Sequence, residues 1–356
     1  MVATVGNYCI LVEDIGSAGI QAILQISAGL GTPPNQIAKK VCQAPSVLIS
    51  EIDFESAEQI NQLLKSIGLN TVVDSEDNIS IENCQLYDVA IRYLEVSHLK
   101  ETLDIISHVI GLEPQKILSL SSLPPGIIIG SVGIGLIDAL QKRLGENAKL
   151  LFAKAHEDIY DIFVEDTQYL PHELKTSLEK TYGKSRGYIP LDVSYEDAKK
   201  LFVKLPKGNS SRIFQRKLLS YDLVLESENH APEAIRALAQ ILDMPEKIVQ
   251  RIMQNTPIVV AEALDYEQSI LMCELAKESN LNLTNRLYNF QQYSLYVDQY
   301  RHHSSIAELK EFYDIALPNR LPAKIKSGFS ELECQILTPQ FDAMGLVYRF
   351  EQEMVE

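Results

Sequence analysis

The stretch YCILVED at Tyr8–Asp14 is an apolar strand pattern that opens on a tyrosine and ends in two acidic residues. Related stretches open at Tyr87 (YDVAIRY), Tyr160 (YDIFVED), Tyr221 (YDLVLES) and Tyr293 (YSLYVDQ). Their spacing of about 60 to 80 residues is that of a small domain, and self-similarity at such a period indicates duplication of a whole structural unit. The sequence therefore predicts five tandem repeats, numbered 1 to 5, at residues 1–82, 83–155, 156–219, 220–291 and 292–356.

Repeat 1 shows the order of elements most clearly. Its apolar residues alternate between strand and helix spacing, glycines at Gly29 and Gly31 end the first helix, and Pro33-Pro34 suits the first turn of a second. The predicted elements, in the order strand, helix, helix, strand, helix, strand, lie at 9–12, 18–28, 34–43, 47–49, 54–67 and 69–73. The predicted fold class is α+β, with tandem two-layer domains that each hold a three-stranded sheet backed by helices.

The later repeats follow the same order with two exceptions. The hinge between the first two helices reads GLGTPPNQI at 29–37, GLEPQKI at 111–117 and LDMPEKI at 242–248. Repeats 3 and 5 lack a clean hinge, and their middles, near 182–190 and 317–326, are shorter and more polar. We therefore predict that these two copies are degenerate.

Repeat 1 resembles the C-terminal domain of the bacterial ribosomal stalk protein, which is similar in fold to the adaptor domain that delivers substrates to a protease's chaperone ring. The matching motifs are IQAI at 20–23, GLG at 29–31, AKKV at 38–41, AP at 44–45 and AEQINQLLKSIG at 57–68. The resemblance implies a three-stranded sheet backed by three helices. In that family the first two helices present basic residues to translation factors. Here the aligned positions hold Gln21 and Leu24, with Lys39 and Lys40 nearby, so the resemblance implies the fold and does not carry the function.

Leucines on the predicted third helices are expected to face the sheet and to hold the core of each repeat. They are Leu63, Leu64, Leu140, Leu144, Leu271, Leu275 and Leu337. Truncation of one to alanine is expected to unfold its own repeat, because loss of a buried leucine costs about 2–5 kcal/mol. A small domain has little more stability than that.

Composition and charge narrow the classes of partner. The chain has a formal net charge of −16 and an apolar fraction of 46%, which is ordinary for a folded protein. Phosphate binding needs clustered lysine and arginine, and the densest basic stretch, 199–217, follows Asp197 and is interrupted by apolar residues such as Leu201, Phe202 and Val203. The longest apolar stretch, 123–140, is too short and too broken by proline and Asp138 for a membrane span. We therefore expect neither nucleic acid nor a membrane as a partner, and the acidity by itself indicates only a protein that stays in solution; the expectation of other proteins as partners rests on the repeats.

The cysteines favour a reducing compartment. They are Cys9, Cys42, Cys84, Cys273 and Cys334, and no two form a C-x-x-C pair. Scattered cysteines of odd number indicate free thiols. The N-terminus also lacks the basic and apolar regions of a signal peptide, so a cytoplasmic protein is expected.

No motif predicts catalytic, cofactor-binding or metal-ligating residues, and we expect a protein that is not an enzyme. His302-His303 is a poor ligand pair, because adjacent side chains point apart in regular structure. The glycine-rich GSVGIG at 130–135 lacks the lysine of a phosphate-binding loop. One alternative stays open: a small-molecule or peptide-binding sensor or enzyme, with its site at a junction between repeats where 126–135 would lie beside His156 and Asp158.

Tyrosines provide the candidate partner-binding residues. The chain has 16 tyrosines and no tryptophan, and Tyr288, Tyr296, Tyr300 and Tyr313 gather near the boundary of repeats 4 and 5. Such a group is typical of an interface, but it could equally cover a sheet edge. Replacing Tyr300 and Tyr313 by alanine is expected to weaken partner capture and to leave folding nearly intact.

The repeats together suggest a function. Predicted linkers are short, so the repeats should form a fixed array, and such arrays offer extended binding surfaces. Sheet edges could also join neighbouring repeats. The leading hypothesis is a non-enzymatic scaffold or adaptor subunit of a larger multiprotein assembly. A phage-tail-like or injection machine is one setting in which duplicated small domains build shells and plugs.

Overall fold

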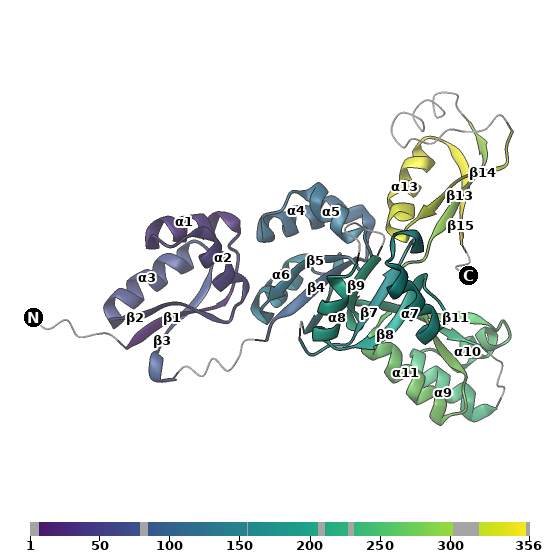
Figure 1. The fold of residues 1–356 in the computed structure, drawn as a ribbon, viewed down its shortest axis with the longest axis horizontal. Helices are drawn as coiled ribbons and strands as arrows, with labels where there is room; N and C mark the ends of the chain where they lie inside the picture. The colour runs from purple at the N-terminus through teal and green to yellow at the C-terminus, as the bar shows by residue number, and fades with distance from the viewer. Residues whose placement is uncertain are drawn as a thin grey trace, which may run out of the picture. The chain divides into compact units, whose positions relative to one another are not determined.

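The computed structural model describes residues 7–78, 85–154, 156–205, 211–226, 231–301 and 320–353. It contains five separate three-stranded sheets, one within each predicted repeat (Figure 1). In every sheet the first strand of the repeat is central, and the second and third strands pair antiparallel with its two sides. The chain divides into two compact units, residues 1–158 with repeats 1 and 2, and residues 159–356 with repeats 3 to 5. The α+β class is confirmed.

Repeats 1 and 2 contain all six predicted elements, and in repeat 1 the helices lie on one side of the sheet (Figure 1). The elements of repeat 1 are β1 (Tyr8–Asp14), α1 (Ile20–Leu30), α2 (Pro34–Cys42), β2 (Ser46–Ile52), α3 (Phe54–Ser66) and β3 (Asn70–Ser75), followed by the 3-10 turn η1 (Glu76–Asn78). Those of repeat 2 are β4 (Tyr87–Tyr93), η2 (Val96–His98), α4 (Leu99–Ile110), α5 (Pro114–Ser121), β5 (Ile127–Val132), α6 (Ile134–Leu144) and β6 (Ala148–Lys154).

Repeat 4 is also complete, whereas repeat 3 has a single α-helix in its middle and the middle of repeat 5, 302–319, lies outside the described residues. Repeat 3 consists of β7 (Tyr160–Val164), η3 (Thr167–Tyr169), α7 (His172–Tyr182), β8 (Gly187–Val193), α8 (Tyr195–Phe202), β9 (Ser211–Gln215) and η4 (Arg216–Leu218). Repeat 4 consists of β10 (Ser220–Leu225), α9 (Pro232–Leu242), α10 (Glu246–Met253), β11 (Ile258–Asp265), α11 (Tyr266–Glu278) and β12 (Leu283–Leu287). Repeat 5 shows β13 (Tyr293–Tyr300), β14 (Ala323–Phe329), α13 (Glu331–Ala343) and β15 (Leu346–Gln352).

The recurring tyrosine stands at the start of the central strand, and in three repeats its ring contacts the helix that follows the second strand. It is the first residue of the strand in four repeats and the second in repeat 4. In repeats 1, 3 and 4 its ring packs on an aromatic ring at the first position of the third helix. The pairs are Tyr8 with Phe54, Tyr160 with Tyr195 and Tyr221 with Tyr266, with ring centroids 5.2, 6.0 and 5.8 Å apart. The tyrosine thus fixes the strand against the helix that follows much later in the repeat.

The aspartate after the tyrosine has its own structural role. In each sheet the second strand carries a β-bulge, whose residue with positive φ is Glu51, Ser131, Asp192, Ala263 or Gly328. In repeats 2 to 4 the aspartate accepts a hydrogen bond from a backbone N–H at the bulge. The pairs are Asp88 with Ser131 (3.0 Å), Asp161 with Leu191 (2.9 Å) and Asp222 with Ala263 (3.2 Å). A bulge takes a donor out of the strand ladder, and the carboxylate satisfies that donor.

The predicted core leucines divide into two groups. Leu64, Leu140, Leu144 and Leu337 are buried as expected, whereas Leu63, Leu271 and Leu275 are exposed, so the prediction was wrong for these three. The cause is the rotation of the helix. α3 buries Ala57, Asn61 and Leu64, and α11 buries Ser269, Cys273 and Ala276. Small residues face the sheet in α11, and its large leucines face outward.

The hinge of repeat 4 is offset by one residue from the alignment that its sequence suggested. Ile37 and Ile117 are buried in α2 and α5, but the aligned Ile248 is exposed and Val249 is buried instead. Pro245 is the N-cap of α10, whereas Pro34 and Pro114 occupy the first helical position of their helices. The core position therefore falls four residues after the N-cap in all three repeats.

Candidate functional site

The glycine-rich segment at 130–135 forms the contact between repeats 1 and 2. The N–H of Gly133, which caps α6, donates to the carbonyl of Cys42 at 2.9 Å, and the N–H of Gly135 donates to the carbonyl of Ala44 at 3.1 Å. A Cβ at Gly133 would overlap the Ala44 carbonyl oxygen, and one at Gly135 would overlap the carbonyl oxygen of Glu13. Glycine permits this close approach. The backbone of repeat 1 therefore fills the side of these two glycines where a side chain would point.

Arg143 ties the other end of α6 to repeat 1. Its Nε donates to the carbonyl of Gly16 at 3.1 Å, and its Nη2 donates to the carbonyl of Ala18 at 2.8 Å and also to Gly16. Burial lowers the pKa of Arg143, and the charge of Asp14 opposes that shift. The two repeats are thus joined by backbone contacts and by a partly buried cation, in addition to the chain that links them.

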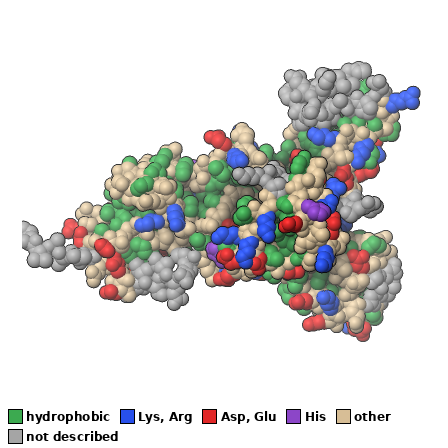
Figure 2. Space-filling model, viewed as in Figure 1, with side chains coloured by type: hydrophobic (Ala, Val, Ile, Leu, Met, Phe, Trp, Pro, Cys, Tyr) green, Lys and Arg blue, Asp and Glu red, His purple; other side chains and the backbone are tan. Residues whose placement is uncertain are grey.

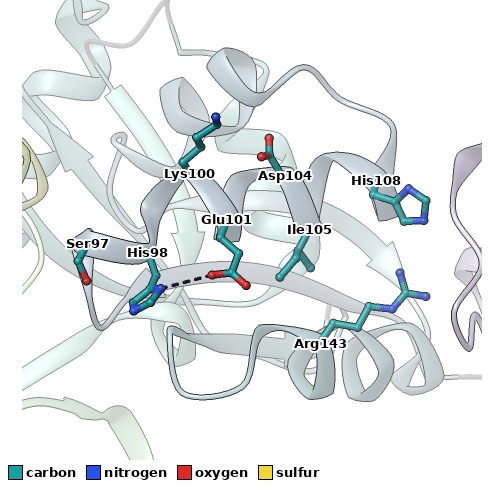
Figure 3. A pocket seen from close by; sticks show the side chains of 8 residues that line it. All are labelled: Ser97, His98, Lys100, Glu101, Asp104, Ile105, His108 and Arg143. Atoms are coloured by element: carbon teal, nitrogen blue, oxygen red, sulfur yellow. Dashed lines mark hydrogen bonds and ion pairs between the residues drawn. The ribbon is translucent and has the colours of Figure 1, made fainter.

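A hollow of about 580 Å³ lies over η2, α4 and α6 of repeat 2 (Figure 3). Glu101 and Ile105 point toward α6, whereas Lys100 and Asp104 point away from it. The Nδ1 of His98 lies 3.3 Å from Oε2 of Glu101. The lining is Ser97, His98, Lys100, Glu101, Asp104, Ile105, His108 and Arg143. It mixes both signs of charge and therefore favours no single class of charged ligand.

A buried ion pair holds the end of repeat 3 to its own sheet. Arg216 donates from Nε to Oδ2 of Asp161 and from Nη2 to Oδ1, both at 2.7 Å, and the Asp161 side chain is fully buried. The Nη2 of Arg216 also lies 2.6 Å from Oδ1 of Asp192, the bulge residue of β8. Buried charges are tolerated when they are paired and hydrogen-bonded in this way.

Two tyrosines extend this network into repeat 4. The hydroxyl of Tyr188 donates to Oδ2 of Asp161 at 2.7 Å, and Tyr188 is also hydrogen-bonded to Tyr221 on β10. Burial, assisted by the nearby Tyr221 and Asp161, raises the pKa of Tyr188 far above its ordinary value, and burial likewise raises the pKa of Tyr221. Both phenols stay neutral at physiological pH. The groups satisfy one another, which is typical of a polar network that fixes a structure.

The segment between repeats 4 and 5 also contacts repeat 3. Phe290 stacks on Phe163 of β7 with ring centroids 4.1 Å apart and planes 6° apart, and lies 5.4 Å from Phe214 of β9. Lys217 of η4 reaches Glu267 of α11 with Nζ and Oε1 2.6 Å apart. Contacts between repeats 3 and 4 are therefore made by both aromatic and charged side chains.

The four candidate tyrosines have different environments. Tyr288, Tyr296 and Tyr300 are half-buried, and Tyr313 lies outside the described residues. Tyr288 is hydrogen-bonded to Glu331 at the start of α13. Tyr300 packs against the core of repeat 5, so its replacement is expected to reduce the stability of that repeat, in contrast to the expectation from the sequence.

Tyr296 lies on the sheet face turned away from the core of repeat 5. Its neighbours on β13, Leu295 and Val297, are fully buried, and successive side chains of a strand alternate between faces. The guanidinium of Arg349 lies 4.8 Å from the centroid of the Tyr296 ring. Arg349 itself is paired with Asp298 and with Glu351, whose Oε1 lies 2.6 Å from its Nε. Tyr296 is thus a half-exposed aromatic ring held in place by a paired arginine.

Within the described ranges, His, Cys, Asp and Glu side chains form no group of three that could hold a metal ion, and no helix is long and apolar enough to cross a membrane. His302, His303 and Cys84 lie outside these ranges. The other four cysteines are free thiols, and burial raises the pKa of each. Their reactive thiolate form is therefore disfavoured at neutral pH.

Sequence reasoning considered the glycine-rich segment 130–135 but not its contact with repeat 1, and it did not single out Arg143 or Arg216. Gly133 and Gly135 stand where α3 of repeat 1 has Asp53 and Glu55, and the loss of side chains at a helix start is a readable signal of close backbone approach. Arg216, by contrast, lies 55 residues from its partner Asp161, and no local pattern links the two.

No protein-family model, no curated protein and no solved structure matches the chain. The resemblance of repeat 1 to the ribosomal stalk domain stays a prediction from its motifs. The functional argument rests on the residues described above.

Proposed function

We propose that the protein is a non-enzymatic scaffold or adaptor that binds other proteins within a larger assembly. The observation that carries the proposal is the contact between repeats 1 and 2, where backbone N–H groups of α6 bond to carbonyls of repeat 1. Such a contact holds two binding surfaces in one arrangement, which is what a scaffold needs. The network around Asp161 does the same for repeats 3 and 4.

The face of the repeat 5 sheet that carries Tyr296 is the proposed partner-binding surface, with Tyr296 as its anchor. Tyrosine and arginine are enriched among the residues that dominate binding energy at interfaces. The stacking of Arg349 on Tyr296 lowers the entropy that the ring loses on binding, because the ring is already ordered. Tyr288 is hydrogen-bonded to Glu331 and Tyr300 packs on the core of repeat 5, so these two tyrosines contribute to the structure of the repeat.

The test is a pull-down of the full chain under gentle conditions, with the variant Tyr296→Ala. Loss of a specific partner from Tyr296→Ala, with retention in the control Tyr169→Ala, is the expected result. Tyr169 is an exposed tyrosine of η3 in the same unit. Recovery of the chain without any partner at every salt and protein concentration would contradict the proposal.

A second candidate is a sensor for a small molecule or peptide at the hollow beside α4, which is favoured by its volume of about 580 Å³ and by the polar side chains on its lining. A thermal-shift screen tests it. A compound that raises the melting temperature of the wild type and not of Glu101→Ala would support this function. Equal shifts in both proteins would place the compound elsewhere.

A further inference from the structure

The first helix of repeat 1 and the hinge after it present a surface without charge. Between Asp14 and Lys39 the chain has no acidic, basic or histidine side chain. Another uncharged run lies between Lys116 and Asp138. Its residues Gly133 and Gly135 are in contact with the backbone of repeat 1. The run in repeat 1 is different, because a large part of it is exposed.

We define the uncharged patch by its exposed apolar residues, which are Leu24, Ala28, Leu30, Pro33 and Pro34. Leu24 is 47% exposed and Leu30 36% exposed. A Cβ built on Gly29 or Gly31, beside them, would meet nothing within 4 Å. In Figure 2 the surface over α1 is drawn mostly in green and tan. No described part of repeat 1 or 2 covers the space beside these two glycines.

We propose that the uncharged patch binds the same patch of a second copy of this chain, α1 against α1 about a two-fold axis. A two-fold contact brings each residue near its own equivalent, so the surface must be complementary to itself. A patch with charges of one sign would repel its copy, whereas an uncharged apolar patch does not. Two copies with a net charge of −16 repel each other overall, and the uncharged patch adds nothing to that repulsion.

The patch also continues an interface that the chain already uses. At its first turn, α1 meets α4 of repeat 2, where a Cβ on Gly19 would overlap the ring of His108 and one on Gly111 would lie 3.0 Å from Cγ1 of Ile20. The helix is thus engaged against a second helix at its N-terminal end, whereas Leu24, Ala28 and Leu30 further along it are exposed in the described part of the chain. A helix of the partner copy would extend the same kind of helix-to-helix packing.

The charge distribution predicts an unusual salt dependence. Salt screens the repulsion between the two acidic copies and leaves the uncharged contact unaffected. We therefore expect the dimer to become tighter as sodium chloride is added, whereas a complex steered by opposite charges would become weaker.

Sedimentation velocity of the full chain over a range of concentrations tests the proposal. The wild type should show a monomer–dimer equilibrium that shifts toward dimer with salt. Leu24→Asp should weaken it by about tenfold or more, because the two-fold contact would bury two unpaired carboxylates. Leu63→Asp is the matched control: this leucine is also exposed, on α3 of the same repeat, and its change should leave the equilibrium intact.

Three results would overturn the proposal: a monomer at all concentrations, equal weakening by Leu24→Asp and Leu63→Asp, or a dimer that dissociates as salt is added. Far-ultraviolet circular dichroism of both variants checks that they fold. The inference is separate from the proposed function, because a dimer that captures no partner would support it and contradict the scaffold.

Discussion

Asp161 and Arg216 form a two-pronged ion pair in which both carboxylate oxygens of a fully buried side chain accept from one guanidinium at 2.7 Å. The pair brings the central strand of repeat 3 to the turn that leads into repeat 4. Because Tyr188 joins the same carboxylate to Tyr221, the pair stabilises the junction of the two repeats as well as one sheet.

Arg216→Met should therefore destabilise the unit of residues 159–356 by about 3–5 kcal/mol, since it leaves a buried carboxylate without its cation. Urea unfolding followed by circular dichroism measures the loss. Lys200→Ala, which breaks the exposed ion pair with Asp197, is the control and should have little effect. An unchanged midpoint for Arg216→Met would show that the network does not hold the repeats together.

Gly133→Ala should separate repeats 1 and 2, because the new Cβ has no room beside the Ala44 carbonyl. Overpacking of this kind costs about 1–3 kcal/mol, and limited proteolysis should reveal new cleavage between the repeats. Gly29→Ala is the matched control, because its Cβ meets open space within α1. That change should raise helix stability by about 0.5–1 kcal/mol. Similar proteolysis patterns for the two variants would contradict the role given to Gly133.

Leu63 and Leu64 are adjacent in sequence and opposite in environment, with 66% and 4% exposure. Leu64→Ala should destabilise repeat 1 by about 2–5 kcal/mol, whereas Leu63→Ala should change stability by no more than about 0.5 kcal/mol. Faster hydrogen exchange of the α3 amides in Leu64→Ala than in the wild type would show that repeat 1 is the part that has lost stability. If Leu63→Ala proves the more damaging of the two, the helix is rotated differently from the structure.

Glu331→Gln should stabilise repeat 5 at neutral pH. Burial, with the charges of Asp222 and Glu262, raises the pKa of Glu331, and its Oε2 is buried without a hydrogen-bond partner in the described part of the chain. A group whose pKa is higher in the folded state than in the unfolded state adds to the free energy of unfolding at pH values below its unfolded-state pKa. That stabilisation is lost as the pH rises through its folded-state pKa. The gain from Glu331→Gln should thus vanish in acid, as thermal unfolding at several pH values would show.

Glu353→Gln is the control of opposite sign. The hydrogen bond from Ser294 lowers the pKa of Glu353. Glu353 therefore adds to the free energy of unfolding at pH values above its unfolded-state pKa. That stabilisation is lost as the pH falls through its folded-state pKa. This variant should be less stable than the wild type at neutral pH and equal to it in strong acid. Parallel pH profiles for the two variants would contradict both assignments.

Much of the architecture could be predicted from the sequence, because the starts of strands, the hinges and the ends of helices depend on residues that lie close together in the chain. Tyr8, Tyr87, Tyr160 and Tyr293 begin the central strands as predicted, and Tyr221 is the second residue of its strand. The outward direction of Leu271 could not be predicted, because the rotation of α11 depends on how closely Ser269 and Ala276 let it approach the sheet. Tyr296 could be selected as a candidate by composition, but its stacking with Arg349 depends on strand register between β13 and β15. Contacts of that kind are set by tertiary structure.

The bulge shared by the second strands has a consequence for how a chain of five similar domains avoids misfolding. Domains joined in one chain are always close to one another, so their strands can meet often. The second strand of each repeat lies at an edge of its sheet. A flat outer strand would be free to pair with the equivalent strand of a neighbouring copy or of another molecule. The left-handed residue at Glu51, Ser131, Asp192, Ala263 or Gly328 bends that strand and breaks its regular row of donors and acceptors. The same irregularity, repeated five times, makes this edge of each sheet a poorer partner for strand pairing, and we expect it to reduce the exchange of strands between domains.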